Sequence, residues 1–262
     1  MCGILFYQGC IDLSIENIND AIKLLNLRGP DNNIYHSISE SKHMGFARLS
    51  INDISSNGDQ PLIKNDNYFL ICNGEIYNHK KLAKLSGSEC TTGSDCEIIL
   101  HMYEKYGIEY TLKMLDGVFA FTLIDQDKNK VYIARDPFGV RPLFIWMRDA
   151  NFVAPIVVAS ELKLGQNLTN FAPRQFPPGH YIETNLRKSQ QIVLSHIRET
   201  CSLKYMAKPY YQINSSINTT INTPEDAQRV IRNSLIAAVE KRITSSNRDR
   251  GAACLLSGGL DS

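Results

Sequence analysis

The chain opens with Met1-Cys2-Gly3-Ile4-Leu5-Phe6-Tyr7-Gln8-Gly9, a thiol at the second position followed by an apolar run. The run over residues 3–9 predicts a buried strand. Initiator methionine is readily removed before a small residue, which would leave Cys2 with both a thiol and a free α-amine. Such an amine has a pKa of about 7.7–8.0 and suits a general base for a thiol. The sequence therefore predicts Cys2 as a nucleophile that carries its own base. The alternative interpretation, a small residue in a first strand, stays open on these two residues alone.

Outward from this stretch, the hydrophobic spacing predicts a mixture of helices and strands. Apolar residues from Ile15 recur at helical spacing as far as Arg28-Gly29-Pro30-Asp31. Ser94-x-x-Glu97 predicts a capping box that opens a helix ending near Gly107. The predicted strands cover residues 43–51, 67–72, 117–124, 130–135, 154–159 and 180–183. This order indicates an α+β layered domain over residues 2–185.

The remainder of the chain predicts a connecting region and the beginning of a second domain. Residues 186–222 are polar and are interpreted as the connecting region. Residues 223–262 contain a helix over 223–243, with Thr223 as its cap and Pro224 at its first position, and a strand over 252–256. The helix is expected to expose the apolar side chains of Val230, Ile231, Leu235 and Val239.

Composition narrows the class of protein. The 262 residues carry a formal net charge of +1, which does not indicate nucleic-acid binding. No apolar run approaches the roughly 20 residues of a membrane span, and the amino terminus does not resemble a signal peptide. The seven cysteines form no C-x-x-C pair, so neither a disulfide framework nor a zinc site is expected. We expect a cytoplasmic protein with reduced thiols.

A series of short motifs resembles one enzyme family over nearly the whole chain. The motifs are Met1-Cys2-Gly3-Ile4, Arg28-Gly29-Pro30-Asp31, Arg48-Leu49-Ser50-Ile51, Gln60-Pro61-Leu62, Asn73-Gly74-Glu75-Ile76-Tyr77-Asn78, Ser94-Asp95-x-Glu97, Asp116-Gly117-x-Phe119-Ala120, Ala134-Arg135-Asp136-Pro137, Ala159-Ser160-Glu161 and Pro177-Pro178-Gly179-His180. The set closely resembles the class II, N-terminal-nucleophile glutamine amidotransferases, and within them the glutamine-hydrolysing asparagine synthetases of asparagine biosynthesis. The resemblance implies a four-layer αββα sandwich, hydrolysis of L-glutamine to glutamate and ammonia through a Cys2 thioester, and no metal or organic cofactor for that half-reaction.

The resemblance also assigns roles around Cys2. It implies that the Asn73 side chain and the Gly74 N–H form an oxyanion hole. An isolated Asn-Gly pair is more often a hairpin turn, which is the alternative here. Arg28 matches a position that supports the Cys2 loop, although a cation at the end of a helix is an alternative interpretation.

Glutamine must also be recognised by its charged end. Arg48 matches the position that binds the substrate α-carboxylate, which a guanidinium suits. Asp95, with Glu75 or its backbone, matches the positions that hold the α-ammonium. An ordinary surface ion pair is the alternative for Arg48 and Asp95. Backbone atoms of Leu49, Ser50, Ile51 and Asn52 are expected to line the same pocket, and the sequence departs from the family pattern nearby at Asp59, Cys72 and Cys96.

The last six residues resemble the pyrophosphate loop of ATP-pyrophosphatase domains. The nucleotide-binding positions implied are Leu255, Ser257, Gly258, Gly259, Asp261 and Ser262. A flexible Gly/Ser tail is the alternative. In complete family members this α/β domain uses ATP and Mg²⁺ to adenylate aspartate, which ammonia converts to asparagine. Only its first helix and strand are expected here, so this polypeptide alone is not expected to make asparagine.

Three functional hypotheses remain open from the sequence. The first is the glutaminase half of an asparagine synthetase, completed by a companion synthetase chain or acting as a homodimer. The second is a stand-alone amidotransferase that supplies ammonia to another partner. The third is an inactive remnant that binds but forms no thioester. In none of them does the sequence indicate a nucleic-acid or membrane partner.

Overall fold

A computed structural model describes residues 1–9, 14–147, 155–185, 207–213, 221, 223–245, 253 and 257–259. The chain divides into two compact units, Met1–Ile213 and Asn214–Ser262. The functional residues near the amino terminus all belong to the first unit. The second unit is described separately below.

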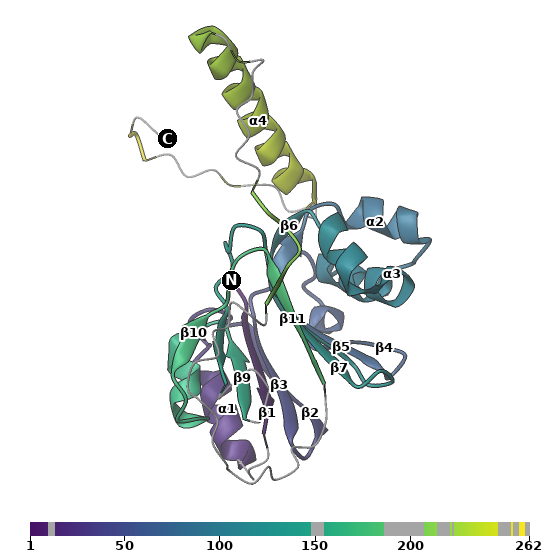
Figure 1. Ribbon diagram of the computed structural model, residues 1–262, viewed down its shortest axis with the longest axis vertical. Helices are drawn as coiled ribbons and strands as arrows, with labels where there is room; N and C mark the ends of the chain where they lie inside the picture. The colour runs from purple at the N-terminus through teal and green to yellow at the C-terminus, as the bar shows by residue number, and fades with distance from the viewer. Residues whose placement is uncertain are drawn as a thin grey trace. The chain divides into compact units, whose positions relative to one another are not determined.

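Two antiparallel six-stranded sheets form the centre of the first unit (Figure 1). Sheet A has the order β10-β8-β9-β1-β3-β2, and sheet B has the order β12-β11-β7-β6-β5-β4. Sheet A consists of β1 (Gly3–Gln8), β2 (Asn32–Ser39), β3 (Lys42–Arg48), β8 (Phe144–Trp146), β9 (Ile156–Ala159) and β10 (Pro173–Gln175). Sheet B consists of β4 (Leu62–Lys64), β5 (Tyr68–Ile76), β6 (Gly117–Asp125), β7 (Lys130–Arg135), β11 (His180–Asn185) and β12 (Lys208–Pro209).

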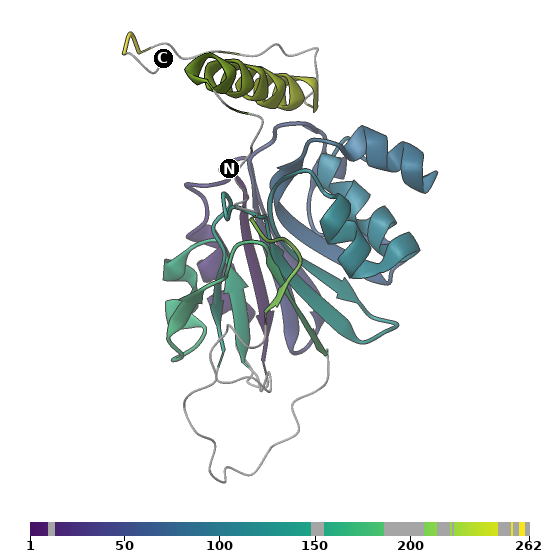
Figure 2. The same ribbon diagram turned by 45° about the horizontal axis from the view of Figure 1, so that its top comes forward.

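Helices cover the outer face of each sheet. Helix α1 (Ile15–Lys23) and the 3-10 helix η3 (Leu162–Asn167) pack on sheet A, whereas α2 (His79–Ser86) and α3 (Ile98–Met114) lie beside sheet B. Figure 2 shows these two helical layers on opposite sides of the pair of sheets. Two further 3-10 turns, η1 (Ser56–Gly58) and η2 (Asp95–Glu97), lie in the connections.

The alternation of side chains along each strand explains the layers. On β1, Ile4 and Phe6 point into the apolar layer between the sheets, whereas Leu5 and Tyr7 pack against the α1 side. On β5, Ile71 joins the layer between the sheets, and neighbouring residues face α3. Strands that are apolar on both faces must be covered on both sides. The resulting order is helix, sheet, sheet, helix, as expected from the resemblance.

Several boundaries differ from the sequence prediction. The helix after Ser94 breaks at Gly107 as predicted, where the backbone has φ 77°, but a second helical segment that the sequence analysis did not predict continues to Met114. The predicted capping box is wrong, because the Ser94 side chain makes no cap bond and Glu97 instead accepts hydrogen bonds from Thr91 and Thr92. The sequence analysis did not predict β2, β4, β8, β10, β12 and α2. Three of these six elements are three-residue strands and one is a two-residue strand, too short for a periodic signal.

The first unit extends beyond the predicted domain boundary at residue 185. Strand β12 pairs with β11 through His180 and Tyr181, and Ala207 lies in the layer between the sheets. The family-like segment therefore includes part of the region interpreted as a connection.

The second unit contains one described helix, α4 (Pro224–Ser245), which confirms the prediction for residues 223–243. Thr223 caps it by accepting a hydrogen bond from the Asp226 N–H at 3.1 Å. The four apolar residues predicted to be exposed on it are exposed: Val230, Ile231, Leu235 and Val239. The strand predicted over 252–256 lies outside the described residues, apart from Ala253. No helix in the described ranges combines the length and the apolar character needed to cross a membrane.

The layer between the sheets should dominate the stability of the first unit. We expect Phe6→Ala to lower the free energy of unfolding by about 3–5 kcal/mol, because Phe6 is fully buried and its loss leaves a cavity. Leu27→Ala is the control, since Leu27 is 92% exposed and should change stability by less than about 0.5 kcal/mol. Urea denaturation followed by circular dichroism measures both. Equal effects of the two substitutions would contradict this account of the core.

Candidate functional site

Cys2 lies immediately before the central strand of sheet A. Strand β1 is held between β3 and β9, and the bonds from Ile4 N to Ser160 Oγ and from Ser160 N to Ile4 O, each 3.0 Å, continue this pairing at the Cys2 end. The Cys2 thiol sits against Leu49: the Leu49 N–H lies 3.4 Å from Sγ, and Sγ lies 3.5 Å from the Leu49 carbonyl oxygen. The N–H and C=O groups of Leu49 therefore both contact the thiol, which lines a pocket.

The Arg28-Gly29-Pro30-Asp31 motif supports the Cys2 backbone and the neighbouring loop. Arg28 Nε donates to the Cys2 carbonyl at 3.1 Å, and its Nη1 reaches Glu161 at 3.4 Å. Asp31 accepts a hydrogen bond from the Ser50 N–H at 2.7 Å. Gly29 packs so closely on β3 that a Cβ would lie 2.2 Å from the Ala47 carbonyl oxygen, so no other residue fits there. The motif thus supports the backbone around Cys2, and Arg28 contacts Cys2 itself.

A pocket beside Cys2 gathers most of the predicted substrate residues. The pocket is small, with a cavity volume of about 50 Å³. Its walls include Cys2, Arg48, Leu49, Ser50, Ile51, Asn52, Gly74, Glu75 and Asp95. Asp53, Gly58, Gln60 and Cys96 also line it, and the sequence analysis gave them no role in the pocket. The Gln-Pro-Leu motif was the available signal for Gln60.

Asn73 does not line this pocket directly. It is 1% exposed, lies within β5 opposite Ala120, and by strand alternation faces the layer between the sheets, like Ile71. Cys2 packs against that same layer. The Asn73 Nδ2 group is buried and has no hydrogen-bond partner among the described residues. A buried amide donor of this kind costs free energy unless a ligand or water accepts from it.

Gly74 follows Asn73 within the same strand, so the hairpin-turn interpretation of Asn-Gly is wrong. Phe119, opposite Gly74, bonds through both its N–H and its C=O to Asp136 on the other side. Gly74 and Phe119 are therefore a non-hydrogen-bonded pair, whose backbone N–H groups point away from one another. A Cβ on Gly74 would lie 2.6 Å from the Val118 carbonyl oxygen, which explains the need for glycine.

The N–H groups on this edge of β5 show where the Gly74 donor points. Cys72 N donates to Gln60 Oε1 at 2.6 Å, and Ile76 N donates to Asp95 Oδ2 at 2.5 Å. Gly74 lies between these two residues with the same strand parity, so its N–H points the same way. Gln60, Asp95 and Gly74 all line the pocket. Along this edge, the Gly74 N–H therefore lies between the N–H groups of Cys72 and Ile76, which already donate to the side chains of Gln60 and Asp95.

Arg48 is buried under the loop that follows β3. Its Nη1 donates to Asp59 Oδ1 at 2.5 Å and to the Ser55 carbonyl at 2.7 Å, and Nη2 donates to the Asp53 carbonyl at 2.6 Å. The alternative interpretation of Arg48 as part of a surface ion pair is therefore wrong. Arg48 does form an ion pair, with Asp59, but the residue is buried and only 6% exposed. Asp59 is one of the positions that departs from the family pattern.

Asp95 and Glu75 lie at the opposite wall and are engaged differently. Asp95 accepts from Asn52 Nδ2 at 2.7 Å and from Ile76 N, whereas Glu75 pairs with Arg141 at 3.0 Å. The Asn52 Oδ1 atom is buried and lacks a partner among the described residues. The Glu75 carboxylate is therefore committed to a cation of the protein, and Asp95 offers the less neutralised carboxylate of the two.

The ionisation of the pocket follows from burial. Burial raises the pKa of the Cys2 thiol above its ordinary value, although the Leu49 backbone and the terminal ammonium oppose the shift. Burial also lowers the pKa of the terminal ammonium of Met1, helped by the charges of Arg28 and Arg141. Both shifts belong to the chain that still carries Met1, in which the terminal amino group is that of Met1 and not of Cys2.

Two acidic side chains fasten the pocket loop to backbone amides. Asp31 holds the Ser50 N–H, and this bond is the main reason that the pKa of Asp31 is lowered. Asp53 holds the Gly93 N–H at 2.8 Å. Burial alone would raise the pKa of Asp53, but hydrogen bonds from Ser55 and Gly93 outweigh it and lower the pKa.

The predicted nucleotide-binding residues are only partly described. Ser257, Gly258 and Gly259 are described, with Gly258 at φ 80° and the Gly259 N–H 3.4 Å from Ser257 Oγ. Leu255, Asp261 and Ser262 lie outside the described residues. The ATP site stays a prediction.

Comparisons with known proteins agree with this geometry. A family model described as a glutamine amidotransferase domain matches residues 1–215. The chain is 37% identical over 274 aligned positions to asparagine synthetase (glutamine-hydrolyzing) of Gallus gallus, covering 100% of this chain and 47% of that protein. It is 38% identical over 283 positions to the Homo sapiens enzyme of the same name, with the same coverage. The chain thus spans about half the length of these curated relatives.

Solved structures support the fold. Glutamine phosphoribosylpyrophosphate amidotransferase from B. subtilis, complexed with ADP and GMP, superposes with a TM-score of 0.56 at 23% sequence identity. The alignment covers 70% of this chain and 47% of that chain. At this identity the likeness concerns the fold alone, whereas the family model rests on the sequence of the first 215 residues. The chain therefore belongs to the glutamine amidotransferase domain family.

Proposed function

We propose that this chain hydrolyses L-glutamine to glutamate and ammonia through a thioester at Cys2, after removal of Met1. The observation that carries the proposal is the Cys2 thiol held against Leu49 in the wall of a pocket, with the buried Asn73 Nδ2 group, which has no hydrogen-bond partner among the described residues, on a neighbouring strand. A thiol, an adjacent amine and an oxyanion hole are the three elements that acyl transfer requires.

The reaction proceeds by acyl transfer and then hydrolysis. The Cys2 amine takes the thiol proton, and Sγ attacks the side-chain amide carbon of glutamine. Asn73 Nδ2 and the Gly74 N–H donate to the developing oxyanion. The C–N bond breaks, the amine returns its proton to the leaving nitrogen, and ammonia departs. Water then attacks the thioester, which releases glutamate and restores the thiol.

The charged groups of the pocket fit the two ends of glutamine. Asp95 provides a carboxylate for the α-ammonium, since its present partners are a neutral amide and a backbone N–H. Arg48 provides the cation for the α-carboxylate, in competition with Asp59. Backbone atoms over residues 49–52 complete the wall.

The wider role that we propose is the glutaminase half of an ATP-dependent, cytoplasmic asparagine synthetase. It is supported by the two asparagine synthetase relatives and by the Gly-rich turn at residues 257–259. Synthesis of asparagine would require aspartate, ATP and Mg²⁺ together with the remainder of a synthetase domain, from a companion chain or a longer form. In the presence of such a domain, aspartate plus ATP should stimulate ammonia release. A stand-alone amidotransferase that supplies ammonia to a different partner would not respond to aspartate plus ATP.

The role of Cys2 is tested by removing its thiol. Cys2→Ala should abolish glutaminase activity, because it removes the nucleophile and leaves the fold intact. The wild type should lose Met1 and gain one adduct from a glutamine-like electrophile in intact-mass spectra. Cys201→Ser is the control variant and should retain activity, since Cys201 lies in none of the motifs from which the site was predicted. Turnover by Cys2→Ala, or by a wild type that retains Met1, would reject the mechanism.

The proposed oxyanion hole predicts a loss of turnover without a loss of binding. Asn73→Ala should lower kcat by about 10²–10³, the effect of removing one oxyanion donor, with little change in KM. The exposed Asn17 on α1 provides the control as Asn17→Ala. Steady-state glutaminase assays measure both constants. A change confined to KM would show that Asn73 binds the ground state instead.

The Asp59–Arg48 pair predicts that removal of Asp59 strengthens the binding of glutamine. Asp59→Ala should lower KM for glutamine about fivefold, or roughly 1 kcal/mol, because the substrate carboxylate no longer competes with a protein carboxylate. Turnover should stay within about twofold. Asp20→Ala on α1 is the control, as this carboxylate pairs with Lys23 away from the pocket. A higher KM in Asp59→Ala would mean that Asp59 orients Arg48 for the substrate.

A further inference from the structure

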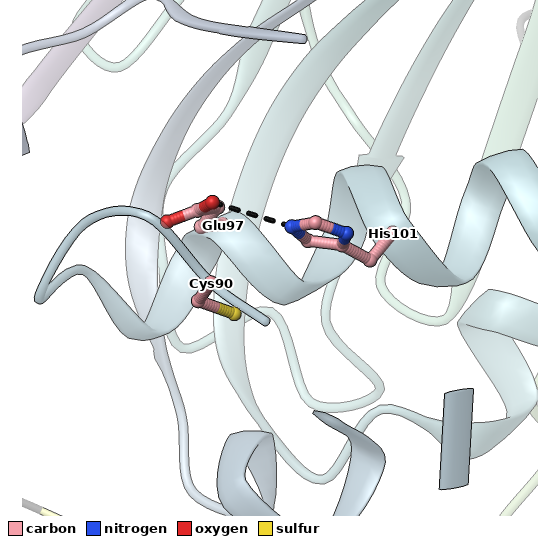
Figure 3. Close-up of side chains that lie close together, drawn as sticks. All are labelled: Cys90, Glu97 and His101. Carbon is pink, nitrogen blue, oxygen red and sulfur yellow. Dashed lines mark hydrogen bonds and ion pairs between the residues drawn. The ribbon is translucent and has the colours of Figure 1, made fainter. Parts of the chain in front are cut away.

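Three side chains with metal-binding atoms lie together outside the glutamine pocket (Figure 3). Cys90 lies in the connection that follows α2, Glu97 ends η2, and His101 lies on α3. Their ligand atoms all lie within 4.8 Å of one another. The sequence predicted no zinc site because it contains no C-x-x-C pair, but the fold joins a helical Glu-x-x-x-His pair to a loop cysteine.

The Glu97–His101 pair already has the spacing of two ligands on one ion. Its Oε1 and Nε2 atoms lie 3.2 Å apart. Zinc bonds of about 2.0–2.2 Å to nitrogen and oxygen, at a tetrahedral angle, place two such ligands roughly 3.3 Å apart. A cation can therefore replace the proton that these two atoms share, without movement of either side chain.

The other contacts of Glu97 orient the carboxylate. Thr91 donates to Oε1 through its N–H at 2.8 Å and its hydroxyl at 3.0 Å. Thr92 does the same for Oε2, at 2.7 Å and 2.6 Å. Hydrogen bonds to a ligating carboxylate are what hold it in place around a metal ion, so these four bonds are compatible with coordination.

Cys90 supplies the third ligand, and solvent has access to the group. The cysteine is exposed and lies in the connection between α2 and η2, and its sulfur is within 4.8 Å of the ligand atoms of Glu97 and His101. Glu97 and His101 also line a cavity of about 410 Å³, which Cys90 does not line. One thiolate, one imidazole and one carboxylate form the donor set of a three-ligand zinc site, with water in the fourth position.

We propose that Cys90, Glu97 and His101 bind a divalent cation of the zinc class. Binding releases the Cys90 thiol proton to solvent, and the His101 proton resides on Nδ1 while Nε2 holds the ion. The inference is independent of the proposed glutaminase function.

The cation would fasten the loop of residues 87–94 to α3. That loop reaches the glutamine pocket, because its Gly93 N–H is held by Asp53, and both Asp53 and Ser94 line that pocket. The metal site thus stabilises the loop that forms one wall of the pocket. The water ligand has no catalytic role.

Cobalt provides a direct test, because a thiolate ligand gives Co²⁺ a charge-transfer absorption that no other ligand here produces. The experiment uses the full chain as Cys2→Ala, which removes the amino-terminal thiol as a competing chelator. Addition of Co²⁺ should produce the thiolate band with one equivalent bound, and Zn²⁺ should remove it by displacement. The band should be lost in Cys90→Ser within the same background, with apparent affinity at least about tenfold weaker.

Cys201→Ser in that background is the matched control and should keep the band, which separates Cys90 from the other cysteines. Far-ultraviolet circular dichroism establishes that each variant is folded. Absence of the thiolate band in folded Cys2→Ala protein, or its persistence in Cys90→Ser, would overturn the proposal. Because the readout is absorption, neither result depends on glutaminase activity.

Discussion

The antiparallel pairing of β1 with β3 and β9 is the constraint on which the site depends. It fixes Gly3 opposite Ala47, and therefore sets Cys2 beside the end of β3 and the loop that follows. Arg28 and Ser160 then hold the backbone at Cys2 and Ile4. The Cys2 thiol is positioned by main-chain geometry, which has far less conformational freedom than a side chain on a loop. The apolar layers on both faces of β1 make this geometry rigid.

The second sheet contributes the complementary part of the pocket. Its strand β5 offers backbone N–H groups along one edge, of which Cys72 and Ile76 are satisfied by Gln60 and Asp95. The position between them, Gly74, is open toward the pocket. The site therefore lies where this edge of β5 in sheet B meets the end of β3 in sheet A.

The sequence predicted which residues share a pocket better than it predicted their contacts. Cys2, Arg48, Gly74 and Asp95 were expected in one pocket from their motifs, and all four line it. The pairing of Arg48 with Asp59 and of Glu75 with Arg141 could not be predicted, since each joins residues brought together only by loop conformation. Long strands such as β5 and β6 gave periodic signals, whereas β8 and β10 were too short to give any. The capping box failed because Thr91 and Thr92 offered Glu97 better donors than the helix end.

The carboxylates that tie the pocket loop to backbone amides have a consequence for behaviour in acid. The pKa values of Asp31 and Asp53 are lowered in the folded chain, so both ties are present above the unfolded pKa and are lost as pH falls through the folded values. The layer between the sheets, in contrast, is apolar and indifferent to protons. Acid therefore acts on the pocket loop only at a pH below the ordinary aspartate pKa of 3.8. There both carboxyl groups become protonated and release the N–H groups of Ser50 and Gly93, whereas the contacts of the apolar layer carry no proton to gain.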